Sequence, residues 1–394
     1  MPIEALSPYD VVVGFPLDCA SGYGARGAGA PMGGRGGFGR VLGALESIVL
    51  EALSRPPCVV QFSGGRDSSV LLAVAARLAR RHGLSPPVPL TVRFPGVAEA
   101  EEVYFQELVV RHLGLGEWER VDAGEDADLL GPPAQGVLLR HGVIWSPVLA
   151  TRASLMALAR GGSVLSGEGG DEVFGQRRSS PLAGLARAGG VSSVARLTSA
   201  SLLESLPRRA RSARLRRHFA RHLGLEWLRP EVREDFLARL AAQWAAEPFL
   251  WRQALRWVTS RRHVRLGTAN MAALAAEAGA FFEAPFLDPR FVVSLARVFR
   301  PLGPANRTEA MRSLFSSYLP EELLARPTKA VFTLPAWGRR TQEFVAGWAG
   351  EGVNPELVDV AALKRHWEMS RPSAMTFGLV QQAWLGQNRR TSSP

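Results

Sequence analysis

The stretch that decides the fold is CVVQFSGGRDSSVLLAVAARLARRH, at Cys58–His82. It opens with the short apolar run Cys58–Phe62, which is typical of a buried strand. A loop of small and polar residues follows, and Ser68–His82 then has the apolar spacing of an amphipathic helix that ends at Gly83. A strand that leads through a glycine turn into a helix begins a βαβ unit, so this stretch predicts an α/β protein.

The same alternation of short apolar runs and amphipathic segments continues on both sides of this stretch. The predicted strands are Val88–Phe94, Glu117–Asp122 and Ser163–Ser166, and the predicted helices are Val41–Leu53, Ala98–Leu113 and Thr151–Ala159. Strands that alternate with helices predict a parallel sheet with helices on both faces. Ligands of such sheets bind beyond the carboxyl ends of the strands.

Three regions are expected along the chain. Residues 1–40 are expected to be a poorly packed lead, because Gly22–Gly39 contains nine glycines and almost nothing to bury. Residues 41–180 hold the α/β core. Residues 181–394 form a mainly helical, substrate-side half. Its predicted helical segments are Trp227–Val258, Ala269–Ala280 and Arg307–Tyr318.

Composition restricts the class of protein. A hydrophobic content of 46% with 21% charged residues is ordinary for a soluble globular protein. No apolar run approaches the roughly 20 residues that cross a bilayer, and the start of the chain has no secretory pattern. Two cysteines, Cys19 and Cys58, exclude a disulfide framework and a cysteine-rich zinc site. A cytoplasmic protein without membrane contact is expected.

The chain carries a formal net charge of +11, much of it in Pro207–His222 and Arg261–Arg265. Such runs fit solvated helix faces, an acidic peptide partner, steering of ATP, or a nucleic acid. No RNA- or DNA-binding motif accompanies the charge, so nucleic acid is not favoured. Only two of the basic residues are lysines, Lys329 and Lys364. Arginine cannot freely replace lysine in a site that needs a compact point charge, so each lysine is a candidate for such a site. Lys364 lies in no motif and is expected at the surface.

The loop Ser63–Ser69 (SGGRDSS) has the composition of an anion site. Its small residues let the backbone approach a phosphate closely, and it leads into a helix whose first N–H groups are unpaired. Asp67 would repel a phosphate unless a cation lay between them, and magnesium resolves that conflict. The spacing differs from the Walker pattern, and no lysine is present in the loop.

A second glycine-rich loop, Ser166–Glu172 (SGEGGDE), also follows an apolar strand. If the two strands are neighbours, Asp171 and Asp67 can converge on one magnesium ion. Glu168 would then lie near the activated group and could orient it or accept its proton.

Together the two motifs resemble the synthetase domain of asparagine synthetases, a family that includes β-lactam synthetases and lasso-peptide macrocyclases. SGGRDSS at Ser63–Ser69 and SGEGGDEVFG at Ser166–Gly175 carry the resemblance. EAPFLDPRF at Glu283–Phe291 and YLPEELLARPTKAVFTLP at Tyr318–Pro335 look like later segments of the family. The resemblance covers roughly residues 41–340 and implies the nucleotide-binding fold of ATP pyrophosphatases.

The resemblance also implies roles for individual residues. Those that hold the pyrophosphate of ATP would be Ser63, Gly64, Gly65, Asp67, Ser68 and Ser69, and the adenosine would lie near Gln61, Val92, Ser166 and Gly167. Asp67 and Asp171 would bind magnesium. Glu168 would serve the acyl-adenylate, and Lys329 would stabilise charge as the adenylate forms and collapses.

The expected activity is the AMP-forming synthesis of an amide from a carboxylate and an amine, as in a ligase, a lactam-forming enzyme or a peptide macrocyclase. True asparagine synthetases carry an N-terminal glutaminase domain that begins with cysteine, whereas this chain has Pro2 and only about 40 residues before the synthetase portion. The nucleophile is therefore expected to be an amine of a substrate, which could be a peptide, with a biosynthetic partner protein as an option. Three alternatives stay open: an ammonia-dependent asparagine synthetase-like enzyme, an RNA-modifying ATP pyrophosphatase, and a non-catalytic nucleotide-binding scaffold.

Overall fold

The computed structural model describes residues 3–18, 37–95, 97, 102–185, 191–299, 301–326 and 335–391. Five parallel strands form its single described sheet, in the order β3-β2-β1-β4-β5. The strands are β1 (Cys58–Gln61), β2 (Val88–Arg93), β3 (Glu119–Asp122), β4 (Ser163–Leu165) and β5 (Phe281–Glu283).

Helices account for most of the remaining described chain. The helices up to β4 are α1 (Pro8–Val13), α2 (Phe38–Leu53), α3 (Arg66–His82), α4 (Val103–Leu113), η2 (Gly124–Ala127), α5 (Pro132–His141), η3 (Pro147–Arg152), α6 (Ala153–Met156) and η4 (Ala157–Ala159). Those after β4 are α7 (Gly170–Phe174), α8 (Ser180–Leu185), α9 (Val191–Ser205), α10 (Arg208–His222), α11 (Pro230–Trp244), α12 (Trp251–Thr259), α13 (Arg262–Glu277), α14 (Pro289–Val298), α15 (Arg307–Phe315), α16 (Glu321–Ala325), α17 (Arg339–Gly347), α18 (Val360–Trp367), η5 (Ala374–Thr376) and α19 (Phe377–Thr391).

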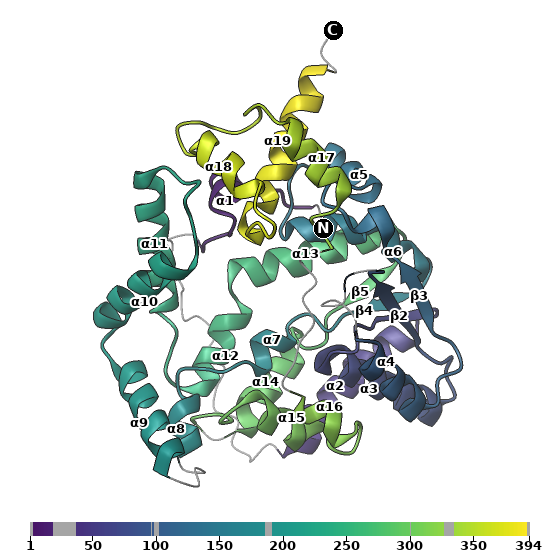
Figure 1. Cartoon of the computed structure of the whole chain (residues 1–394). Helices are drawn as coiled ribbons and strands as arrows, with labels where there is room; N and C mark the ends of the chain where they lie inside the picture. The colour runs from purple at the N-terminus through teal and green to yellow at the C-terminus, as the bar shows by residue number, and fades with distance from the viewer. Residues whose placement is uncertain are drawn as a thin grey trace.

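Helices cover both faces of the sheet, as the sequence predicts (Figure 1). Successive side chains of a strand point to opposite faces. On β1, Cys58 and Val60 therefore join a core with α2, α3, α14 and α15, whereas Val59 joins a core with α5, α6 and α13. The central strands β1 and β4 are mostly apolar because helices cover both of their faces, whereas the edge strand β3 is charged and largely exposed.

A second helical body packs beside this sheet, at the top of Figure 1. Its core joins α1, α11, α17, α18 and α19 around buried tryptophans, among them Trp227, Trp348 and Trp367. The largest buried cluster, by contrast, joins α2 and α3 to α12, α14, α15 and α16. The predicted division at residue 180 therefore does not separate two hydrophobic cores.

The structure changes several predicted element boundaries. Phe281–Glu283, where no strand was predicted, pairs with β4 as the edge strand β5. The predicted helical segment 227–258 is interrupted at residues 245–250, between α11 and α12. Thr151–Ala159 is built from short helical turns, in part 3₁₀, rather than one helix. Three residues are too few for hydrophobic periodicity to distinguish a strand from a loop.

The prediction of a poorly packed lead is wrong for residues 3–18. A capping box between Ser7 and Asp10 starts α1, and Val11, Val12 and Val13 are almost fully buried in the core of the second helical body. Six helical residues are too few to show a periodic pattern. The prediction for residues 1–40 depended instead on the glycine content of Gly22–Gly39. Residues 19–36 lie outside the described residues.

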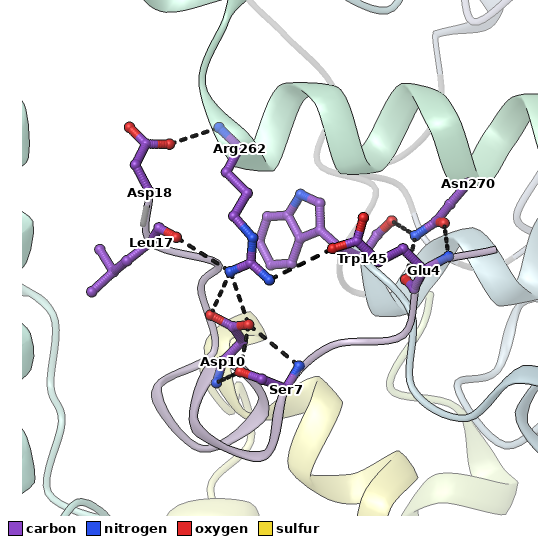
Figure 2. Close-up of polar contacts among 8 residues, drawn as sticks. All are labelled: Glu4, Ser7, Asp10, Leu17, Asp18, Trp145, Arg262 and Asn270. Atoms are coloured by element: carbon purple, nitrogen blue, oxygen red, sulfur yellow. Dashed lines mark hydrogen bonds and ion pairs between the residues drawn. The ribbon is translucent and has the colours of Figure 1, made fainter. Parts of the chain in front are cut away.

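Arg262, the first residue of α13, ties this segment to the rest of the protein (Figure 2). Its Nη1 donates to both carboxylate oxygens of Asp10 at 2.9 Å and to the carbonyl of Leu17 at 3.2 Å. Its backbone N–H donates to Asp18 Oδ1 at 2.7 Å. Asp10 is only 3% exposed, so the Arg262 guanidinium compensates for the burial of this carboxylate.

We expect Arg262→Ala to lower the free energy of unfolding by about 3 kcal/mol, because it leaves the buried Asp10 carboxylate without its cation. Arg265→Ala is the matched control, since Arg265 is exposed on the same helix and should change stability by less than about 0.5 kcal/mol. Urea unfolding of the two variants measures the difference. Equal stabilities would show that this network does not anchor the N-terminal segment.

Candidate functional site

The two glycine-rich loops meet at the carboxyl edge of the sheet. Strands β1 and β4 are hydrogen-bonded neighbours, with Val60 opposite Leu165. The first loop (Ser63–Ser69) and the second loop (Ser166–Glu172) follow these strands, so the parallel pairing sets them side by side. The structure thus brings together the two loops that the sequence analysis singled out.

The backbone of the first loop has a fixed shape. Gly64 has φ +84°, and a Cβ there would lie 2.7 Å from Cγ of Gln106. Gln106 Nε2 donates to the carbonyl of Ser63 at 3.0 Å, and the N–H of Gly65 donates to Ser63 Oγ at 3.2 Å. Gly65 is the N-cap of α3 and offers no side-chain cap, which leaves the helix start available to an anion.

The second loop packs directly on the first through its glycines. A Cβ on Gly167 would lie 3.0 Å from the backbone nitrogen of Ser68, and one on Gly170 would lie 2.2 Å from Cγ of Asp67. The left-handed φ of +88° at Gly169 turns the chain into α7, which carries Asp171. The glycines of this loop therefore allow the carboxylates of Asp67 and Asp171 to approach each other.

A cavity of about 540 Å³ opens at this edge, a size that suits a small-molecule ligand. The predicted residues that line it are Gln61, Ser63, Gly65, Asp67, Ser68, Val92, Ser166, Gly167, Glu168 and Asp171. Gly64 and Ser69 are not among the lining residues. Ser69 is fully buried in α3, and Gly64 is turned toward Gln106 and Arg326. These two residues support the first loop from behind.

Arg307, at the start of α15, joins the two carboxylates. Its Nη2 donates to Asp67 Oδ2, and its Nη1 donates to Asp171 Oδ1. Burial lowers the pKa of the Arg307 guanidinium, but the charges of Asp67 and Asp171 outweigh that effect and raise it. Asp67 and Asp171 therefore converge on one cation, as a shared metal site requires.

A buried ion pair supports the first loop from the other side. Arg326 and Glu102 have side chains that are each 5% exposed, and Arg326 pairs with both oxygens of Glu102. Arg326 Nη1 also donates to the carbonyl of Gly64 at 3.0 Å, and its guanidinium lies 4.0 Å from the ring centroid of Phe105. Breaking such a pair would leave a buried charge beside the loop.

Three residues of the site, Arg307, Arg326 and Glu102, were not predicted from the sequence. One signal was available for Arg307: two carboxylates that converge need a cation between them when no metal is bound. Arg326 lies three residues before Lys329 within the quoted C-terminal segment, but nothing in the sequence pairs it with Glu102.

The acidic residues of the second loop create an unusual electrostatic environment. Burial, aided by the charges of Glu168 and Asp171, raises the pKa of Glu172 to about 7. Arg152 lines the same cavity, and burial lowers the pKa of its guanidinium while Glu168 opposes that shift. The cavity thus presents both signs of charge near Glu168. The predicted Lys329 lies outside the described residues.

A family model described as asparagine synthase matches residues 41–385 of the 394-residue chain. The chain belongs to the asparagine synthase family. A comparison with curated proteins gives no significant match. Family membership makes the protein an ATP-dependent synthetase that forms carbon–nitrogen bonds. No helix among the described residues is long and apolar enough to cross a membrane.

The family typically uses ATP with Mg²⁺, and the cavity fits both. Asp67 and Asp171 already share one cation, Arg307, so their oxygens can be presented to a divalent ion. Gly65 and the start of α3 offer a site for phosphate oxygens. Magnesium bound there would neutralise phosphate charge beside two carboxylates that would otherwise repel it.

We expect Gly170→Ala to weaken binding of Mg²⁺-ATP about a hundredfold, because the new methyl group would displace the Asp67 carboxylate. Gly43→Ala in α2 is the control, since a Cβ there meets nothing within 4 Å. Calorimetric titration of both variants with Mg²⁺-ATP measures the effect. Unchanged affinity in the Gly170 variant would mean that the contact between the loops is not needed for nucleotide binding.

Proposed function

We propose that the protein activates a substrate carboxylate as an acyl-adenylate and transfers the acyl group to an amine of a substrate rather than to ammonia. The observation that carries this proposal is the convergence of Asp67, Asp171 and Glu168 on one cavity at the sheet edge. This arrangement fits a phosphate-binding half beside an acyl-binding half. A peptide that carries both the carboxylate and the amine is one substrate of this kind.

The reaction would take place in two steps. A carboxylate oxygen attacks the α-phosphorus of ATP, the bond to the bridging oxygen breaks, and pyrophosphate leaves. The amine nitrogen then attacks the acyl carbon and gives up a proton. The bond between the acyl carbon and the phosphate oxygen breaks, and AMP leaves. The first loop would align the phosphates, and the apolar wall of Val148, Leu155 and Leu158 would limit access of water.

Two residues are proposed to act near the acyl group. Glu168 would orient the substrate or accept the proton of the amine, because it lines the cavity on the second loop. Lys329 would stabilise charge on the transferring phosphate. Chain connectivity supports that role, since Arg326 and Pro335, which flank residues 327–334, both line the cavity.

We expect Asp67→Asn and Asp171→Asn each to lower ATP–pyrophosphate exchange by about a hundredfold or more, because each removes charge that would hold the metal at the phosphates. Asp122→Asn is the control, since Asp122 is exposed and pairs with Arg93 at the end of β3. Exchange is measured with a panel of carboxylates and peptides, and hydroxylamine is added to trap the activated acyl group as a hydroxamate.

The nucleophile is identified by comparing products formed with ammonium and with candidate amines. Amide formed only with ammonium would contradict the proposed amine and favour an asparagine synthetase-like reaction. Tight ATP binding without exchange or hydroxamate for any substrate of the panel would instead favour a non-catalytic nucleotide-binding role.

A further inference from the structure

One arginine lies where the proposed metal would bind. The side chain of Arg307 is 19% exposed and forms ion pairs with Asp67 and Asp171 through its two terminal nitrogens. Asp67 is equally shielded, at 19%, whereas Asp171 is 51% exposed. Among the described residues, the two carboxylates thus share the guanidinium of Arg307.

The backbone that carries Arg307 is rigidly placed. Asn306 caps α15, with its Oδ1 accepting from the N–H of Glu309 at 2.9 Å. Behind the cap, Met311 and Phe315 are fully buried in the largest hydrophobic core. The long side chain of Arg307 is therefore the part that can change partners while the helix stays in position.

The neighbour Arg66 makes the present position of Arg307 dependent on the carboxylates. Arg66 Nη1 donates to Thr308 Oγ1 at 3.3 Å and to the carbonyl of Leu324 at 3.4 Å. Burial, together with the positive charge of Arg307, lowers the pKa of the Arg66 guanidinium. If a divalent ion binds Asp67 and Asp171, Arg307 loses both of its carboxylate partners and lies beside two other cations, the ion and Arg66. It must then pair with another anion.

The same guanidinium geometry that fits two carboxylates also fits phosphate oxygens. Arginine forms paired, charge-assisted hydrogen bonds to carboxylate and to phosphate. A guanidinium and a divalent ion cannot both occupy the position between two aspartates. Binding of metal-bound phosphate at this edge of the sheet would therefore exclude Arg307 from its present pairs and bring it a new anion.

We propose that Arg307 is a displaceable counter-ion: it holds Asp67 and Asp171 together before the nucleotide binds, yields them to the metal, and then pairs with the phosphates. This proposal rests on the nucleotide site of the proposed function, and it adds a phosphate-binding residue outside the two motifs. It implies effects of opposite sign. Arg307 competes with a metal alone, but it assists pyrophosphate that arrives with metal.

The test is binding of Mn²⁺ alone, and of pyrophosphate with Mg²⁺, to the full chain and to Arg307→Gln. We expect the variant to bind Mn²⁺ about tenfold more tightly, and pyrophosphate about tenfold more weakly, than the unchanged protein. Paramagnetic resonance of free Mn²⁺ measures the first affinity and calorimetry the second. Unaltered Mn²⁺ affinity would overturn the counter-ion role, and unaltered pyrophosphate affinity would overturn the transfer to phosphate.

Arg312→Gln is the matched control, because Arg312 lies on the same helix and pairs with the exposed Glu321. It should change neither affinity. Arg307→Lys is a second test if the glutamine variant unfolds at a lower temperature. A single ammonium bridges the two aspartates less well than a guanidinium, so Mn²⁺ should still bind more tightly than in the unchanged protein. Unchanged Mn²⁺ affinity in the lysine variant would contradict the proposal. These measurements use no carboxylate substrate, so they test the role of Arg307 even if the protein does not form an acyl-adenylate.

Discussion

The site depends on the parallel pairing of β1 with β4. This pairing places two loops, about a hundred residues apart in sequence, at one edge of the sheet. The contact is close because Gly167 and Gly170 have no side chains, so the second loop rests on the backbone of Ser68 and beside the carboxylate of Asp67. A side chain at Gly167 would press on the backbone of Ser68, and one at Gly170 would displace the Asp67 carboxylate from the cation that it shares with Asp171. The electrostatics of the site thus follow from a steric condition.

Much of the fold was predictable because it depends on local patterns. Short apolar runs such as Cys58–Phe62 gave four strands within a few residues of their observed bounds, and a parallel sheet followed from the alternation with helices. The fifth strand, Phe281–Glu283, is too short to show a period. The packing of Val11–Val13 was hidden because its partners, α11 and α17–α19, lie more than two hundred residues away in the sequence. Long-range contacts of this kind leave no local signal.

The same limit applies to the site. Ser63, Asp67, Glu168 and Asp171 lie within motifs that follow predicted strands, so their meeting at the sheet edge could be predicted on the condition that the two strands are neighbours. Arg307 and Glu102 lie outside those motifs, and their roles depend on which charge the tertiary structure places opposite them. The sequence did indicate that Asp67 and Asp171 converge on one cation, and it assigned magnesium to them. It did not identify the guanidinium that also lies between them.

The basic composition acquires a different meaning in the folded protein. The run Arg261–Arg265 suggested a cationic surface, but Arg261 is fully buried, pairs with Asp18, and lies over the rings of Trp244 and Trp257. The other basic run, in α10, does present an exposed face, at Arg208, Arg209, Arg216, Arg217 and Arg221.

Arginine suits the buried positions because its planar, weakly hydrated guanidinium can stack on aromatic rings and bind two oxygens at once. Part of the positive charge therefore serves as internal counter-ion, as at Arg262 for Asp10 and Arg326 for Glu102. Arg307 differs from these two because one of its partners, Asp171, has a side chain that is 51% exposed, whereas those of Asp10 and Glu102 are each 5% exposed. Water or a metal ion can reach an exposed carboxylate and replace its counter-ion, whereas a buried carboxylate depends on the guanidinium beside it.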